Sequence, residues 1–229
     1  MEIFSPEFFS ALLAIIVIDL VLAGDNAIVI ALAARGLPPE RQKQVIVWGT
    51  VGAIVIRALM TLAVVWLLNI PGLMLFGGLL LIWIAYKLIV SNAESKHHTD
   101  QNSNAGLWAA IKTIIIADAV MGIDNVLGVA GAAHGSFLLV VLGLLISVPI
   151  MVLGSSLVLK WIERFPSIIY IGAAVLAWTA ASMITKEQWL ITYIDMQGAI
   201  KWAVYGLAMG VVLVLGYIRN KTRVTNIIA

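Results

Sequence analysis

Apolar residues fill most of the chain in long runs, and short polar segments separate these runs. A helix needs about 20 mostly apolar residues to cross the hydrocarbon core of a membrane. The pattern therefore predicts an all-α membrane protein that forms a single transmembrane domain over residues 1–229. We expect seven transmembrane helices, over Phe8–Ala34, Val45–Leu68, Pro71–Val90, Leu107–Ala133, Ser136–Leu159, Pro166–Ile184 and Gly198–Ile218.

The longest polar stretch, residues 91–106, divides the chain into two similar halves. A shift of the sequence by 99 residues superposes identical residues without a gap. Seven of the matched pairs are Asp19 and Asp118, Asp25 and Asp124, Asn26 and Asn125, Ala31 and Ala130, Ala33 and Ala132, Ala34 and Ala133, and Gly36 and Gly135. We therefore expect residues 8–90 and 107–184 to be three-helix repeats, with residues 198–218 as an additional helix.

The distribution of Lys and Arg predicts the orientation, because cytoplasmic loops are enriched in these residues. With seven spans and the N-terminus outside, most of them fall on the cytoplasmic side, and only Lys186 and Lys201 fall outside. The C-terminus is then cytoplasmic. A repeat of three helices crosses the membrane an odd number of times, so the second copy enters from the opposite face. We therefore expect inverted repeats, an arrangement in which secondary transporters bind their substrate near the middle of the membrane.

Composition excludes several classes of protein. Hydrophobic residues make up 62% of the chain and charged residues 11%, which is far from a soluble domain. The chain has no cysteine, which excludes disulfides, thiolate metal sites and cysteine nucleophiles. The net charge of +2 gives no indication of nucleic-acid binding. The N-terminal residues lack the basic region of a cleaved signal peptide, so we expect the first apolar run to be retained as a helix.

The candidate site is an acidic motif that occurs twice inside apolar runs. Each copy has an Asp, a second Asp six residues later and then an Asn: Asp19, Asp25 and Asn26 in the first, and Asp118, Asp124 and Asn125 in the second. Carboxylates are costly in hydrocarbon, so acidic residues within spans indicate function. Asp19 is about 18 Å into its helix, near the middle of a hydrocarbon core of about 30 Å.

The spacing within each motif predicts a broken helix. Six residues turn an α-helix by about 240° beyond one full turn, so the two Asp of a copy point to different faces. They converge only if the helix bends or unwinds between them. Because glycine lowers the cost of such a break, we expect one near Ala23-Gly24 and another near Met121-Gly122.

The donor set predicts a hard divalent cation as ligand. The six motif residues offer only carboxylate, amide and carbonyl oxygens, which suit Mg²⁺, Ca²⁺ and Mn²⁺ rather than Zn²⁺ or Cu⁺. Arg57 is the other charged residue at mid-depth, and we expect it to pair with a motif Asp or a carbonyl and to act as a counter-ion. His97 and His98 lie in the polar loop and His134 at a span boundary, where a metal-capturing role is a weaker alternative.

The double motif, Asp-x-x-x-x-Gly-Asp-Asn-Ala followed by Asp-x-x-x-x-x-Asp-Asn, resembles that of the TerC family, in its short bacterial YjbE-type branch, within the LysE-like transporter superfamily. The similarity extends from Phe8 to about Ile184. It implies manganese export, and in some members the supply of metal to enzymes outside the membrane. It maps the acidic motif of the family onto the six residues named above. The second copy departs from the pattern, because Ile123 precedes Asp124 and Gly122 lies one position earlier.

From these observations we expect a multi-pass protein of the bacterial plasma membrane, not an enzyme, that exports Mn²⁺ by proton antiport. Manganese is then a transported substrate, and we expect no organic cofactor. The motif chemistry leaves open a Ca²⁺ or Mg²⁺ exporter of the same architecture, an intramembrane aspartic enzyme, and an assembly partner of a secretion complex. The sequence also leaves open the coupling stoichiometry, the direction of transport, the role of the His97-His98 loop, and whether the protein is a homodimer or has secretion-machinery or exoenzyme partners.

Overall fold

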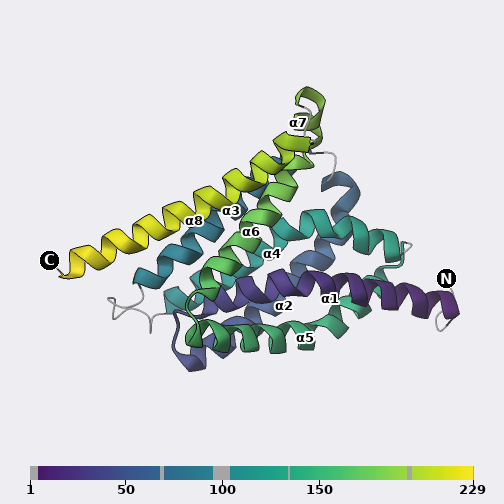
Figure 1. Cartoon of the computed structure of the whole chain (residues 1–229). Helices are drawn as coiled ribbons and strands as arrows, with labels where there is room; N and C mark the ends of the chain where they lie inside the picture. The colour runs from purple at the N-terminus through teal and green to yellow at the C-terminus, as the bar shows by residue number, and fades with distance from the viewer. Residues whose placement is uncertain (1–4, 68–69, 95–103, 134, 195–197, 229) are drawn as a thin grey trace.

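The computed structural model describes residues 5–67, 70–94, 104–133, 135–194 and 198–228, and every regular element in them is a helix. The helices labelled in Figure 1 are α1 (Pro6–Ala34), α2 (Pro39–Leu67), α3 (Leu73–Glu94), α4 (Asn104–Ala133), α5 (Phe137–Arg164), α6 (Ile168–Thr185), α7 (Gln188–Tyr193) and α8 (Gly198–Ile228).

The helices have the length and composition of membrane spans. Within the described residues, α2–α6 and α8 are long and apolar enough to cross a membrane, and α1 is a seventh candidate when its two parts are counted together. These helices correspond to the seven predicted spans. Large apolar side chains such as Val21, Leu153 and Leu207 are more than 70% exposed, as expected for residues that face lipid tails. The short helix α7 was not predicted.

Helix α1 starts at a polar cap and bends at the motif. The Ser5 hydroxyl accepts a hydrogen bond from the Phe8 backbone N–H at 3.2 Å, which satisfies one free donor at the helix start. The axis changes direction by 44° between Pro6–Val21 and Ala23–Ala34. The predicted break near Ala23-Gly24 is therefore observed, as a bend.

Helix α4 differs from the prediction. It continues through Met121 and Gly122 as one helix, and within the described residues only α1 has a bend of this size. An unbroken helix satisfies all of its backbone hydrogen bonds, which matters most in hydrocarbon, and a lone glycine permits a break without requiring one. Asp118 and Asp124 consequently point to different sides of α4.

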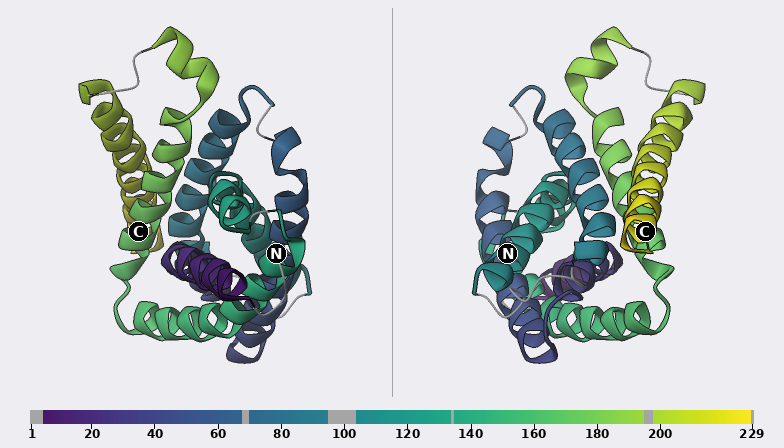
Figure 2. Two further views of the ribbon diagram at one scale, coloured as in Figure 1. Left: turned by 90° about the vertical axis from the view of Figure 1, so that its right-hand side faces the viewer. Right: turned by 90° about the vertical axis from the view of Figure 1, so that its left-hand side faces the viewer.

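The packing pairs each helix of the first half with one of the second half. Helix α1 packs mainly on α5, α2 on α4, and α3 on α6, while α8 packs on α6 and α3. Exchanging α1, α2 and α3 with α4, α5 and α6 reproduces these pairs, as two related repeats require. Figure 2 shows α1 and α4 in the interior of the bundle and α8 on its outer side.

Glycines allow the closest approach in all three principal pairs. A Cβ added to Gly143 of α5 would lie 2.4 Å from Ile15 of α1, and one added to Gly49 of α2 would lie 2.7 Å from Ile114 of α4. A Cβ on Gly78 of α3 would lie 2.7 Å from the Ala180 carbonyl oxygen of α6. Small residues of this kind let membrane helices pack backbone to backbone. The two chain ends lie at opposite ends of the bundle (Figure 1), whereas their assignment to outside and inside stays a prediction.

Candidate functional site

Two motif carboxylates meet at one guanidinium in the interior. Arg57 of α2 donates from Nη1 to Asp19 Oδ1 at 2.6 Å, and from Nη2 to Asp118 Oδ1. The three side chains are buried, with exposed fractions of 3% for Arg57, 0% for Asp19 and 5% for Asp118. Charge-assisted hydrogen bonds of this kind offset part of the desolvation cost of buried ions. The pairing of Arg57 with a motif Asp is thus observed, and it involves both copies of the motif.

Four helices converge on this centre. Asp19 comes from the first part of α1, Asp118 from the middle of α4, and Arg57 from α2, which packs directly on α4. From α5, the Ser147 hydroxyl donates to Asp19 Oδ2, the carboxylate oxygen that Arg57 leaves free. The centre holds two carboxylates and one guanidinium, and so has one negative charge in excess when both Asp are ionised.

A second feature of the interior is a set of polar atoms without partners. Both polar atoms of the Asn26 side chain and Oδ2 of Asp118 have no hydrogen-bond partner in the described part of the chain. Both residues line one narrow space together with Val29, Ile30 and Ile114, and this space does not admit a sphere of the size of water. Buried polar groups are rarely left unsatisfied in a native structure. The arrangement therefore has unused oxygen ligands beside the excess negative charge.

The remaining residues of the motif lie apart from this centre. Asp25 is half-buried beside Thr179 of α6, and Asn125 is half-buried on α4. Asp124 faces a cavity between α3, α4 and α7, and its Oδ2 atom is 2.5 Å from Nζ of Lys186. The bend in α1 does not bring Asp25 to the partners of Asp19, because Asp25 projects toward α6.

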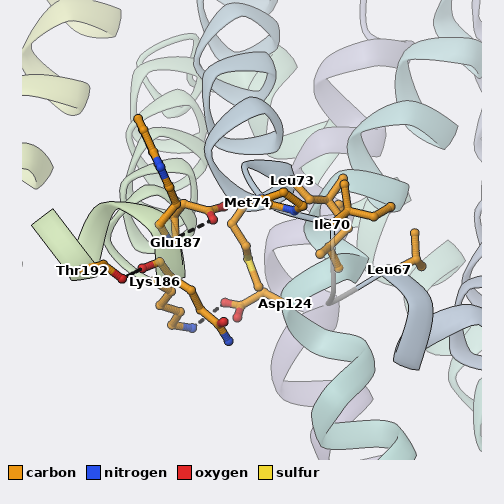
Figure 3. A pocket seen from close by; sticks show the side chains of 12 residues that line it. Leu67, Ile70, Leu73, Met74, Asp124, Lys186, Glu187 and Thr192 are labelled. Carbon is orange, nitrogen blue, oxygen red and sulfur yellow. Dashed lines mark hydrogen bonds and ion pairs between the residues drawn. The ribbon is translucent and has the colours of Figure 1, made fainter.

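The cavity at Asp124 has a volume of about 470 Å³ and opens to the surroundings. We call it the Asp124 cavity. Figure 3 shows Asp124 beside Lys186 among the residues that line this cavity, with Thr192 and Glu187 nearby. Its lining residues are Leu67, Ile70, Pro71, Leu73, Met74, Ile123, Asp124, Lys186, Glu187, Gln188, Trp189 and Thr192.

Glu187 fastens the end of α6 to the start of α3. Its carboxylate accepts hydrogen bonds from the backbone N–H groups of Gly72 at 3.1 Å, Met74 at 3.1 Å and Leu75 at 3.3 Å, and from Trp189 at 3.3 Å. Burial raises the pKa of this carboxyl, but the four backbone hydrogen bonds outweigh burial and hold the pKa below its ordinary value of 4.5. A carboxylate at this position also complements the positive end of the α3 dipole.

The structure thus brings together part of the predicted site. Asp19 and Asp118 meet at Arg57, and Asn26 opens onto the same narrow space as Asp118, whereas Asp25, Asp124 and Asn125 lie elsewhere. Among the described residues, no three His, Asp or Glu side chains are grouped closely enough to hold a metal ion. The role of the six motif residues as metal ligands therefore stays a prediction. His97, His98 and His134 lie outside the described residues.

Sequence reasoning did not single out three polar residues near the motif. Ser147 was one of several hydroxyl residues within spans, and Ser155 and Ser156 merely donate to carbonyls of their own helix. Lys186 and Glu187 lie beyond the end of a span, where charges are common. The sequence feature that could have indicated them is a pair of adjacent opposite charges on the predicted outer side of the membrane, which is otherwise poor in Lys and Arg.

Comparison with known proteins agrees with the motif. The model of the "Integral membrane protein TerC family" matches residues 4–224. The chain is 43% identical over 195 residues to the "Uncharacterized membrane protein YjbE" of Bacillus subtilis, covering 85% of this chain and 88% of that protein. It is 26% identical to the "Uncharacterized membrane protein YkoY" of the same organism, covering 77% of this chain and 60% of YkoY.

A longer relative is the "UPF0053 protein YegH" of Escherichia coli, which is 25% identical over 79% of this chain but matches over only 37% of its own length. No solved structure matches the chain. The match to the family model and the identity with YjbE both extend over most of the sequence. The chain is an integral, multi-pass membrane protein that belongs to the TerC family.

Proposed function

We propose that the protein is a secondary transporter that exports a divalent cation, Mn²⁺, with the centre at Asp19, Asp118 and Arg57 as its binding site. The observation that carries this proposal is the convergence of two repeat-equivalent carboxylates on one buried positive charge. A site built in this way holds a cation by two oxygen donors, one from each repeat. Asn26 and the free oxygen of Asp118 supply further donors beside it.

Arg57 serves as the counter-ion when no metal is bound. Its guanidinium occupies the position between the two carboxylates, so an incoming metal ion displaces it. An unpaired carboxylate pair in the interior carries a large desolvation cost, and a tethered cation keeps this cost low during the return of the empty carrier. Arg57 is thereby a competitor of the substrate as well as a stabilising residue.

The charge balance favours proton antiport. Two ionised Asp and one Arg leave one negative charge, which a proton neutralises. A divalent ion that displaces the guanidinium neutralises both carboxylates, and the proton is no longer retained. The same carboxylates then bind metal and proton in alternation, which is the basis of exchange.

The identity of the metal rests on two arguments of different strength. The donors are all oxygen, which selects Mn²⁺, Mg²⁺ and Ca²⁺ over softer ions. Only the family resemblance favours Mn²⁺ among these three, and the names of the relatives YjbE and YkoY do not assign a substrate. A Ca²⁺ or Mg²⁺ exporter of the same architecture is therefore an outcome of the test.

The transport route follows from the repeats. Pairing of α1 with α5, α2 with α4 and α3 with α6 supports the inverted repeat, and the 44° bend in α1 lies between Asp19 and Asp25. We propose that rocking of one repeat against the other exposes the centre alternately to the two faces. The N-terminus lies outside and the C-terminus in the cytoplasm in this proposal.

Two other classes fit the geometry less well. In an aspartic protease two carboxylates share a proton directly, whereas Asp19 and Asp118 are joined through Arg57. This argues against an aspartic protease. A scaffold for a secretion complex needs no buried charge at all, and the three buried ions argue for a working site. Partners, including a second copy of the chain, stay predictions.

The test is cation flux in proteoliposomes that contain the purified protein. Mn²⁺, Mg²⁺, Ca²⁺ and Zn²⁺ are compared, with and without an imposed pH gradient. We expect Mn²⁺ flux that a pH gradient accelerates and that Asp118→Asn reduces at least 100-fold, while the matched surface variant Glu163→Gln keeps it. Flux that is equal in wild type, Asp118→Asn and empty vesicles would refute the proposal, and indifference to the pH gradient would refute the antiport.

A further inference from the structure

The Asp124 cavity contains a carboxylate that the proposed site does not use. Asp118 and Asp124 lie on different sides of the same helix, α4, and only Asp124 faces the open cavity. In the proposed transport cycle, a cation leaves the buried centre toward this end of the bundle and passes the cavity beside Asp124. A free carboxylate there would bind the ion again and slow its departure.

The carboxylate of Asp124 has a tethered cation instead. Nζ of Lys186 is 2.5 Å from Asp124 Oδ2, and the Lys186 side chain is 53% exposed, against 19% for Asp124. Exposed ion pairs of this kind are weak and exchange readily. A metal ion at high concentration can therefore displace the ammonium from Asp124. At low metal concentration the ammonium keeps the metal ion from binding there.

The main chain at Lys186 is held in place by its neighbour. Lys186 is the C-terminal cap of α6, and Glu187 binds the first turn of α3 through Gly72, Met74 and Leu75. The ammonium thus belongs to a unit formed by α6 and α3, whereas Asp124 belongs to α4. Figure 3 shows Glu187 turned toward Met74 and Lys186 turned toward Asp124.

We propose that Lys186 is a tethered competitor of the transported cation, which occupies Asp124 at the mouth of the pathway and prevents the released ion from binding there again. The inference rests on the proposed function for the identity of the ion. Because the pair connects α6 to α4, relative movement of these helices separates it. Asp124 is then more available to the cation when the two units have moved apart.

The competition is measured by a spin label in the cavity. The chain has no cysteine, so Thr192→Cys on the exposed side of α7 provides a single labelling site that lines the Asp124 cavity. Mn²⁺ is paramagnetic and broadens the spectrum of a nearby label, whether or not the protein transports it. A separate variant, Gln44→Cys, places the label at an exposed position on α2 that does not line the cavity. Its spectrum corrects for collisions with dissolved Mn²⁺.

We expect Lys186→Met to lower the Mn²⁺ concentration for half-maximal broadening at position 192 about fivefold, in line with the weakness of exposed ion pairs. Lys186→Gln is the second neutral variant and should give the same change, while Lys186→Arg keeps the parent value. Asp124→Asn combined with Lys186→Met should abolish this gain in apparent affinity for Mn²⁺.

An unchanged half-maximal concentration in both neutral variants overturns the inference. A gain in apparent affinity that survives Asp124→Asn overturns it as well. Failure of Mn²⁺ flux in the vesicle assay would instead overturn the proposed function, since the label does not depend on transport.

Discussion

Asp19 and Asp118 occupy equivalent positions in the two copies of the motif, and they share one partner, the guanidinium of Arg57. Each carboxylate binds a different terminal nitrogen of that group. This shared contact joins the two halves of the chain through charged side chains, whose burial costs the most free energy. It also explains how two carboxylates are accommodated in the interior, because the guanidinium supplies the opposite charge.

Replacement of Arg57 should make stability depend on metal. Arg57→Met leaves two buried carboxylates without an opposite charge, and removal of one member of a buried ion pair costs about 3–5 kcal/mol. We expect a large fall in the melting temperature of purified protein in a chelator, and recovery on addition of Mn²⁺ that exceeds the effect on wild type. The triple variant with Asp19→Asn and Asp118→Asn serves as control, since it should be stable and insensitive to Mn²⁺. Equal responses of wild type and Arg57→Met to Mn²⁺ would contradict the account.

Glu187 should stabilise the fold in a pH-dependent way. Its pKa is lower in the folded protein than the ordinary value of 4.5, so the unfolded state binds the proton more tightly. The stabilisation is therefore complete above pH 4.5 and is lost as the pH falls through the lowered value. Glu187→Gln should cost about 1–3 kcal/mol at pH 7, and this difference from wild type should shrink at lower pH.

Thermal unfolding of both proteins in detergent between pH 3 and pH 8 provides the measurement. The exposed carboxyl variant Glu163→Gln is the control for general acid effects. A difference between wild type and Glu187→Gln that stays constant down to pH 3 would show that the charge of Glu187 is irrelevant to the anchor.

Gly78 should be intolerant of a methyl group. Its Cβ position lies 2.7 Å from the Ala180 carbonyl oxygen, a backbone atom that cannot move without displacing α6. Gly78→Ala should destabilise the protein by about 1–3 kcal/mol, the usual cost of overpacking. Gly206→Ala in α8 is the matched control, because no atom lies within 4 Å of its Cβ position, and the higher helix propensity of Ala should stabilise it by up to about 1 kcal/mol. Equal melting temperatures for the two variants would refute the close contact between α3 and α6.

The orientation can be tested with the same cysteine positions used for labelling. Thr192→Cys on α7 should react with a membrane-impermeant maleimide in intact cells, because the excess of Lys and Arg assigns the opposite end of the bundle to the cytoplasm. Gln44→Cys on α2 should react only after permeabilisation. The reverse pattern would invert the predicted topology and with it the assignment of the Asp124 cavity to the outside.

The spans were predictable because the thickness of the hydrocarbon core sets the length of an apolar run. The predicted span Pro166–Ile184 and the observed helix Ile168–Thr185 differ by only two residues at the start and one at the end. Helix α7 was missed because six residues are too few for a hydropathy signal. The two predicted breaks show the limit of local reasoning, since Gly24 and Gly122 each permit a break but, among the described helices, only α1 has a bend of this size.

The pairing of buried charges in the candidate site was predictable, because it depends only on the cost of leaving a buried charge unpaired. The cost of an unpaired charge at mid-depth predicts that Arg57 finds an Asp, and the structure agrees. The sequence does not reveal that Asp124 turns away from Asp118, because this follows from the unbroken course of α4. The partners of Asp124 and Glu187 come from helices distant in the sequence, so only the fold brings Lys186 and the first turn of α3 to them.

The measurement that tests the central claim most directly is the stoichiometry of Mn²⁺ binding to the purified protein, counted by electron paramagnetic resonance of the free ion. At Mn²⁺ concentrations below those that fill the Asp124 cavity, we predict about one bound Mn²⁺ per chain in wild type and in Glu163→Gln, and loss of that ion in Asp19→Asn and in Asp118→Asn. Bound Mn²⁺ that persists unchanged in both Asp variants would contradict a metal site shared by the two halves of the chain.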